Sequence, residues 1–452
     1  MTGTLGQFRP ASVDGLATPV SWHPLWRTAF RFCVVYFGLY CVLNTYIVFE
    51  LLGVLGRWIR SGPWVVSLTD PVTGWVGRTL FGVDAVLHED SGAGDQTALW
   101  VLVFCMLVAA AVATAVWTVV DRRTSHPRLP AWYMLFLRLC LAGQMLSFGF
   151  AKLIPTQMPG PTLAQMLQPY GSLSPMSVLW LQVGSSHPYE MALGGAEVVI
   201  GLLLFVSRTA TLGAALCLAS MTQVLLMNMT FDVPEKLLSS HLLLISLVLL
   251  APYLRRLVNV FVLQRACEPL TQPPLFIDNR KNRIADWVLV ALAIWVAFAC
   301  GSDRWVVWQH QYGPASPKSE LYGIWDVRDF NLDGRPVPPL TTDENRWQRL
   351  VFDDPGAATY QRMNGDLVPV RADFLPDGKL ELTTLTNTPG AQDGRRPPFA
   401  TLSAEQPTPD RLLLRGKLRD RPVAIDLERV DPNSFTLRSR GFHWVQDYAY
   451  LR

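Results

Sequence analysis

The sequence predicts a polytopic bundle of about seven transmembrane helices followed by a soluble antiparallel β-domain. Hydrophobic residues make up 50% of the chain and charged residues only 17%. Seven apolar stretches approach the roughly 20 residues that a helix needs to cross the core of a bilayer. After Ser302 the pattern changes to short runs that alternate apolar and polar residues, which is typical of strands. We therefore expect a membrane part and a soluble part in one chain.

The predicted spans are joined by connections of very different length. The fourth and fifth are separated only by Ser207 and Arg208, so we expect them to form a tight helical hairpin. The seven spans are Phe30–Leu52, Ala98–Val120, Ala131–Ile154, Tyr189–Val206, Thr209–Met229, Lys236–Leu254 and Ile284–Cys300.

The distribution of basic residues predicts the orientation of these spans. With the N-terminus inside, the inner segments hold thirteen Lys and Arg residues and the outer loops five, which follows the positive-inside rule. We expect a multi-pass protein of the bacterial inner membrane, with a cytoplasmic N-terminus and an extracytoplasmic β-domain. The first 27 residues lack the pattern of a cleavable signal peptide, so the first span is expected to direct insertion. A net charge of +3 is too small to indicate a nucleic-acid partner.

These spans imply seven segments along the chain. The seven cysteines fall in or near the spans without a CxxC pair, so neither a disulfide framework nor a metal site is expected. The segments are a cytoplasmic N-terminus (1–27), two helices with an outer loop (28–130), a four-helix unit (131–256), a cytoplasmic linker (257–283), the seventh helix (284–301), a second linker (302–320) and the β-domain (321–452).

About eight candidate strands, separated by turn sequences such as Asp333-Gly334 and Asn364-Gly365, suit a closed antiparallel barrel, and a sandwich is the alternative. The first strand opens with Gly323-Ile324-Trp325, and this start resembles the lipocalin pattern, in which the Trp closes one end of the barrel. The interior could hold an apolar ligand or be filled by its own side chains. The strands are Gly323–Phe330, Trp347–Asp353, Thr359–Arg362, Leu367–Phe374, Lys379–Thr384, Arg411–Lys417, Val423–Arg429 and Phe435–Phe442.

Four ionisable residues, Arg138, Lys152, Glu197 and His241, lie in or at the ends of predicted spans. A charge at the centre of a bilayer costs roughly 2.5 to 3.5 kcal/mol, so such residues usually face a bundle interior and mark a functional site. Arg138 and Lys152 fall within about 40° of one helix face. Glu197 is expected near the midplane, where Arg138 is its natural partner, and the pair could serve only to lock two helices together.

The loop between the fifth and sixth spans adds Asn228, Asp232 and Lys236 to the predicted outer rim of the bundle. Together with Lys152 and His241 they could hold a polar head-group or a quinone oxygen. The alternatives are that Lys152 extends to the interface and that His241 is a neutral histidine bonded to a neighbouring helix.

The block from Arg138 to Leu254 resembles a DoxX-type four-helix membrane unit. The residues that carry this resemblance are Arg138, the run Gly149-Phe150-Ala151-Lys152-Leu153, the spacing of Gly195, Glu197 and Gly201, and the final His-containing helix. The whole chain resembles a bacterial group of larger DoxX-related proteins. This resemblance implies association with quinone, or with another isoprenoid lipid, and with partner proteins of a membrane redox system. Quinone is the only cofactor it suggests.

A more remote similarity is to the transmembrane domain of vitamin K-dependent γ-carboxylases. It implies a hydroquinone-using enzyme with Lys152 as the catalytic base. His241 is the other candidate catalytic residue. A non-catalytic scaffold and a small-solute transporter are further alternatives. Whether the chain is an enzyme is therefore left open by the sequence.

Overall fold

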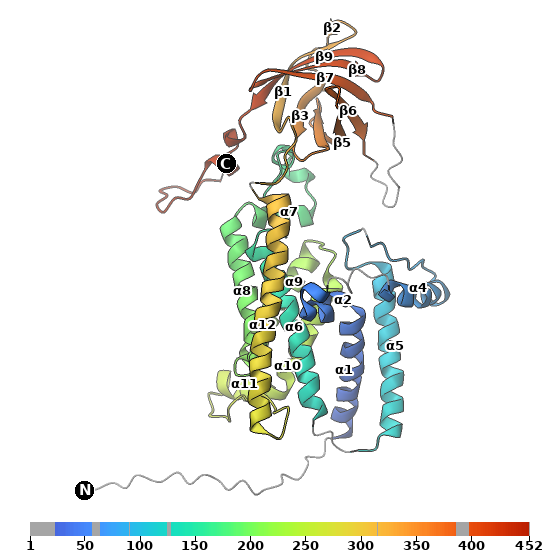
Figure 1. Ribbon diagram of the computed structural model, residues 1–452, viewed down its shortest axis with the longest axis vertical. Helices are drawn as coiled ribbons and strands as arrows, with labels where there is room; N and C mark the ends of the chain where they lie inside the picture. The colour runs from blue at the N-terminus through green and yellow to red at the C-terminus, as the bar shows by residue number, and fades with distance from the viewer. Residues whose placement is uncertain are drawn as a thin grey trace, which may run out of the picture. The chain divides into compact units, whose positions relative to one another are not determined.

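The computed structural model confirms a helical membrane bundle and a C-terminal β-barrel (Figure 1). It describes residues 23–56, 64–89, 91–123, 128–313, 315–385 and 397–451. Within these ranges seven helices are long and apolar enough to cross a membrane, so the chain is a multi-pass membrane protein. Most of the predicted segment 1–27 lies outside the described residues.

Seven helical stretches form the membrane part. Two of these stretches contain more than one helix. Helix α10 continues into the short helices η5 and α11, and helix α12 continues into the π-helical turn η6. The stretches are α1 (Pro24–Leu43), α5 (Thr97–Val120), α6 (Leu129–Leu153), α8 (His187–Phe205), α9 (Ala210–Thr230), α10 with η5 and α11 (Lys236–Leu250, Ala251–Tyr253 and Leu254–Phe261) and α12 with η6 (Asn279–Val307 and Trp308–Tyr312).

The first and last spans differ from their predicted bounds. Helix α1 begins at Pro24, since the His23 side chain accepts a hydrogen bond from the Leu25 amide, and it ends at Leu43, where Asn44 is extended. Residues predicted to continue it form the short helices α2 (Thr45–Val48) and η1 (Phe49–Leu52) instead. Helix α12 is longer than predicted because polar residues at both ends continue the helical turns.

Further short helices lie in the connections. Helix α4 (Trp64–Val76) and the π-helical turn η2 (Gly77–Phe81) follow the first span, and α7 (Pro175–Gly184) precedes the fourth. By its internal contacts the chain divides into two compact units. Unit 1 holds Met1–Ser147, Glu197–Leu226 and Pro234–Ala299, and unit 2 holds Phe148–Ala196, Met227–Val233 and Cys300–Arg452.

Helix α8 approaches α6 closely at two glycines. A Cβ on Gly194 would lie 2.2 Å from the Leu153 amide nitrogen in unit 2, and one on Gly201 would lie 2.9 Å from the Leu146 side chain in unit 1. No larger residue fits at either point without displacing its neighbours. Small residues at such crossings allow membrane helices to gain close packing.

The β-domain is an up-and-down barrel in which each strand pairs with the next. Strand β1 also pairs with β9, from Ile324 opposite Val430 to Leu332 opposite Val423, so the sheet closes without a free edge. The barrel strands are β1 (Gly323–Leu332), β3 (Trp347–Phe352), β4 (Ala357–Arg362), β5 (Leu367–Phe374), β6 (Lys379–Thr384), β7 (Ala400–Thr408), β8 (Arg411–Leu418) and β9 (Arg421–Val430), with a two-residue strand β2 (Arg335–Pro336) beside β1.

Large side chains of the barrel itself fill its interior. Trp325, Phe330, Trp347 and Phe352 are all buried in one cluster with aliphatic residues from the other strands. The Trp325 indole donates a hydrogen bond to the Leu321 carbonyl (2.9 Å). Of the two alternatives left open by the sequence, the packing favours an interior filled by side chains.

The prediction of the strands was wrong in two places: one predicted strand is not a strand, and one observed strand was not predicted. Residues 435–442, predicted as the last strand, contain the short helix α13 (Thr436–Ser439), because β9 already occupies the edge of β1. Strand β7 was not predicted, since its inward residues are mostly small and its second half, Glu405 to Thr408, is polar and contains a proline.

The connection between α6 and α7 is bound to the outside of the barrel within unit 2. The Asp353 carboxylate, at the end of β3, accepts hydrogen bonds from the amides of Leu163 (2.9 Å) and Ala164 (3.3 Å). Leu163 packs in a small core with Ile324 and Val351, whose side chains point away from the barrel interior. Ionised acceptors make hydrogen bonds of about 1.5 to 3 kcal/mol, so this contact is a specific attachment.

We expect Asp353→Ala to release this connection while the barrel stays folded. Losing charge-assisted bonds of that strength should raise amide exchange at Leu163 and Ala164 by about tenfold or more. Hydrogen exchange measured by mass spectrometry over 160–168 and over the barrel strands tests this. The control is Asp354→Ala, because Asp354 is exposed; equal exchange in both variants would contradict the attachment.

Candidate functional site

A cavity in unit 1 surrounds Arg138 and is the candidate site. It encloses about 630 Å³, part of it open to the surroundings. Arg138 comes from α6, and Ser207 lies in the α8–α9 hairpin. Gln272 belongs to the linker before α12, and Asp286 lies in the first turns of α12. Apolar side chains complete the walls, and these are Ala131, Leu135, Pro273, Pro274 and Leu275.

The polar groups of this cavity are held in place from outside it. Asn282 bonds both backbone groups of Phe276 (2.8 and 2.9 Å), which fixes the linker against α12. The Gln272 amide donates to the Thr211 hydroxyl (3.1 Å), and the Ser207 hydroxyl donates to one oxygen of Asp286 (2.7 Å). The site is therefore preorganised by residues that are distant in sequence.

Arg138 itself has unused hydrogen-bonding capacity. Its side chain is only 5% exposed, and its Nε has no hydrogen-bond partner among the described residues. Its electrostatic partners are Asp286 and, more weakly, Tyr253. A buried donor without an acceptor is costly, so a group that supplies an acceptor here would be bound.

The predicted pairing of Arg138 with Glu197 stays a prediction, while Arg138 interacts electrostatically with Asp286. Asp286 lies in the first turns of α12, near the end of the bundle that holds the α8–α9 hairpin. Glu197 is buried in α8 and interacts electrostatically with Cys217 of α9. Arg138 and Glu197 were recognised from the sequence, but Asp286 was not.

His241 is enclosed by aromatic residues of α1. Its ring is stacked on Tyr40, with 3.7 Å between centroids and 5° between planes. Its Nδ1 bonds the Leu237 carbonyl (2.7 Å), which can only accept, so Nδ1 carries the proton and Nε2 accepts from the Tyr36 hydroxyl (2.7 Å). Both ring nitrogens are therefore used, as in the alternative of a neutral histidine bonded to a neighbouring helix.

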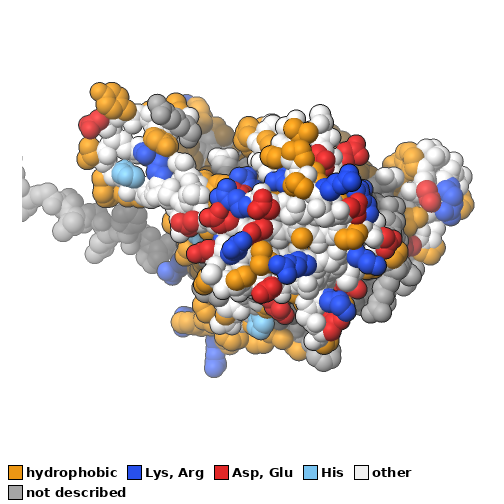
Figure 2. Space-filling view, turned by 90° about the horizontal axis from the view of Figure 1, so that it is seen from above, with side chains coloured by type: hydrophobic (Ala, Val, Ile, Leu, Met, Phe, Trp, Pro, Cys, Tyr) orange, Lys and Arg blue, Asp and Glu red, His pale blue; other side chains and the backbone are white. Residues whose placement is uncertain are grey.

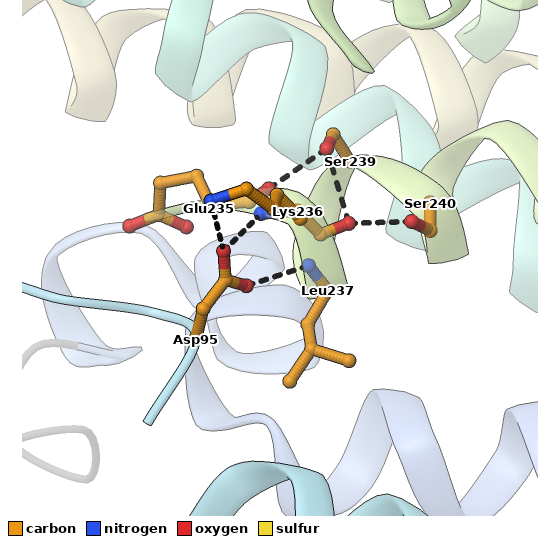
Figure 3. A network of polar contacts seen from close by, with 6 residues as sticks. All are labelled: Asp95, Glu235, Lys236, Leu237, Ser239 and Ser240. Atoms are coloured by element: carbon orange, nitrogen blue, oxygen red, sulfur yellow. Dashed lines mark hydrogen bonds and ion pairs between the residues drawn. The ribbon is translucent and has the colours of Figure 1, made fainter. Parts of the chain in front are cut away.

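Lys236 takes part in a polar network at the start of α10 (Figure 3). The Asp95 carboxylate accepts hydrogen bonds from the amides of Lys236 and Leu237 (both 2.8 Å) and lies 3.5 Å from the Lys236 ammonium. It thus caps two of the free amides that every helix start exposes. Lys236, which was predicted to lie at the outer rim of the bundle, therefore helps to anchor α10 to the loop before α5.

Glu235 stands next to this cap and titrates abnormally. Burial, followed by the nearby negative charge of Asp95, raises the pKa of Glu235 to about 7. Two carboxylates share the start of α10, and Lys236 supplies the cation between them.

Lys152 lies in unit 2 with Glu190, the first of the two glutamates on α8. Lys152 is 8% exposed, packs over the Phe148 ring (5.7 Å) and interacts electrostatically with Glu190. Glu190 is fully buried and accepts a hydrogen bond from the Met158 amide (3.0 Å). Opposite charges in one buried environment suit a structural pair, although they leave the predicted catalytic role of Lys152 untested.

Asn228 and Asp232 form the turn that ends α9, also in unit 2. Asn228 is buried, and its carbonyl accepts from the Val233 amide (3.0 Å). Asp232 is exposed and has a φ of 52°, a conformation that Asp adopts more readily than most residues. Their position fits a helix end, and no contact described here ties them to a ligand.

Sequence reasoning missed Arg31, the most completely buried basic residue among those that the structure describes. Its Nη2 donates to the Asp121 carbonyl (2.8 Å), and its guanidinium lies over the Trp117 ring (5.4 Å). The sequence does contain a signal for it, a cation in the third turn of an apolar helix. Asp286, at the start of an apolar span, was visible in the same way.

Comparison with known proteins yields one limited similarity. The chain is 29% identical over 140 residues to YwoB of Bacillus subtilis (strain 168), described as an uncharacterized protein; the match covers 31% of this chain and 86% of YwoB. No protein-family model matches the chain, and no solved structure matches it.

We expect Tyr36→Phe to destabilise the bundle. The change removes the donor to His241 Nε2 and leaves a buried acceptor unsatisfied, at a cost of about 1 to 3 kcal/mol. Thermal melting in detergent should show a clear loss. Tyr170→Phe is the control, because Tyr170 is exposed. An unchanged melting temperature for Tyr36→Phe would show that this bond contributes nothing.

We also expect the start of α10 to be stabilised by acid. With a folded pKa of about 7 and an unfolded pKa near 4.5, Glu235 contributes stability that is complete below pH 4.5 and lost as the pH rises through 7. Glu235→Gln should remove this part of the change in melting temperature between pH 4.5 and 7.5. Glu89→Gln, at an exposed position in the loop before α5, should retain it.

Proposed function

We propose that this chain is a membrane subunit that binds the polar end of a quinone or another isoprenoid lipid in the Arg138 cavity. The observation that carries the proposal is the buried Arg138 Nε, without a partner among the described residues, in a cavity lined by both polar and apolar residues. Ligand sites usually combine apolar walls with a few placed polar groups. Polar residues form half of the lining here, which suits the polar end of a lipid.

The charges of the cavity select among lipids. Arg138 and Asp286 are opposite, so together they favour a neutral polar group over a phosphate. Arg138 supplies donors, while Asp286 supplies acceptors. A quinone carbonyl accepts from the former and a quinol hydroxyl donates to the latter, so both forms suit the pair.

The likeness to DoxX-type proteins supports the same proposal and adds a context. Electrons for any quinone chemistry would come from partner proteins of a membrane redox system, with the protein supplying the binding site. The barrel, whose interior is filled, would then serve to bind a partner. Basic residues near the Arg138 end support a cytoplasmic side there and an extracytoplasmic barrel in a bacterial inner membrane.

The γ-carboxylase-like alternative has less support. Lys152 would act as a base on that view, but it shares a buried environment with the Glu190 carboxylate. His241 would lie beside the reaction, yet both of its ring nitrogens are already bonded.

We expect Arg138→Gln to lose the bound lipid. Native mass spectrometry with lipid extraction, on gently solubilised protein, should find a quinone or isoprenoid in the wild type and about 10-fold to 100-fold less in the variant, which corresponds to one lost charge-assisted bond. Arg208→Gln is the matched control, since Arg208 is exposed beside Ser207. Asp286→Asn tests the acceptor separately. Equal lipid in Arg138→Gln and the control would refute the site.

A further inference from the structure

The chain ends in a segment whose apolar side chains point into solvent. This C-terminal segment, residues 435–451, follows β9 and a short 3-10 helix, η7 (Pro432–Ser434). Trp444 is 92% exposed and Tyr448 88%, and Phe442, Val445 and Leu451 are exposed as well. Exposed apolar surface of this kind usually marks a site of interaction.

The segment has contacts of its own, but they do not cover these side chains. Arg440 lies over the Tyr450 ring (4.1 Å) and donates to the Gln446 side chain (2.8 Å). Phe442 and Trp444 meet edge to face at 5.0 Å. The segment therefore combines exposed aromatic rings with arginines.

The outer face of the barrel is different. There, acidic and basic side chains alternate, as Figure 2 shows, and pair as Arg411 with Asp426 and Arg328 with Glu428. Hydrophobic side chains are seen at the left of Figure 2, where Figure 1 places the C-terminal segment, and in a second group at the upper middle. Any binding partner of apolar character is thus expected at the segment and not at the charged barrel face.

Two short connections keep the barrel near the ends of membrane helices. Ten residues separate Tyr312 at the end of η6 from Gly323 of β1, and nine separate the end of α6 from Leu163, which is bound to the barrel. At about 3.5 Å per residue, ten residues reach at most ~35 Å. The C-terminal segment leaves the barrel at this same end, because Val430 of β9 pairs with Ile324 at the start of β1.

Aromatic residues mark that surface on α12. Trp305, which is half exposed, stacks on Trp308 at 5.2 Å, and exposed Tyr312 follows one turn later. Trp and Tyr are enriched at membrane interfaces because their rings have an apolar body and a polar group. The C-terminal segment has the same composition.

From these observations we infer that the C-terminal segment binds the head-group layer of the bilayer, on the side where the barrel lies. Its aromatic rings enter the interface, and Arg438 and Arg440 contact lipid phosphates. This binding is independent of the Arg138 cavity and anchors the end of the barrel domain to the membrane.

Photo-crosslinking from single positions tests this inference on the full chain. Benzoylphenylalanine replaces Trp444 in one variant and Tyr448 in another, and each is reconstituted singly into nanodiscs of phosphatidylethanolamine and phosphatidylglycerol. The control position is Leu340, which is 56% exposed in the β2–β3 connection. We expect lipid adducts by mass spectrometry at 444 and 448, and only background at 340.

Other outcomes would overturn the inference. Adducts within the chain, adducts to another protein in native membranes in place of lipid, or yields equal to those at 340 would each show that lipid does not cover the segment. Loss of lipid adducts at 448 in the Phe442→Ser, Trp444→Ser double variant would support insertion of the rings as a group. Lipid bound at Arg138 should be unchanged in that variant, so failure here is distinct from failure of the cavity.

Discussion

The bundle depends on one constraint, which is that a polar group within an apolar helix must find its partner inside the protein. Arg31 finds Asp121, and His241 finds Tyr36. Each of these contacts joins two helices that are far apart in the sequence. The amino acids that are unfavourable in hydrocarbon are therefore the ones that determine which helices lie together.

The Arg138 cavity is one place where this constraint is met incompletely; Arg31 is another, since its Nε and Nη1 have no partner among the described residues. Ser207 satisfies one oxygen of Asp286, while the Nε of Arg138 has no partner among the described residues. Structures keep such a group when its cost is offset by a role, commonly in binding. Its neighbours Gln272 and Asn282 hold the linker in place through hydrogen bonds to Thr211 and Phe276.

The sequence predicted the periodic parts of this fold well. Strands β5 and β6 have the predicted bounds, because alternation and turn residues act locally. Strand β7 was missed because it is recognised as a strand only from its pairing with neighbouring strands. Residues 435–442 were assigned wrongly because closure of the barrel by β9 is a property of the whole sheet.

The candidate site was predicted less well for a related reason. Arg138 could be recognised as a buried cation, but its partner could not, since pairing within a bundle depends on how helices are arranged around one another. Asp286 follows Arg138 by more than a hundred residues and stands on a helix outside the four-helix unit that the sequence suggested. Local patterns identify which residues need partners, and only the packed structure identifies the partners.

The attachment of Leu163 and Ala164 to Asp353 has a mechanical consequence. A domain joined to a membrane protein by a single connection can swivel about it. The barrel is held at a second point, through the loop between α6 and α8. It can therefore rotate only about the line that joins this point to its connection with α12. A load applied to the barrel would then be transmitted through this loop to the adjoining ends of α6 and α8.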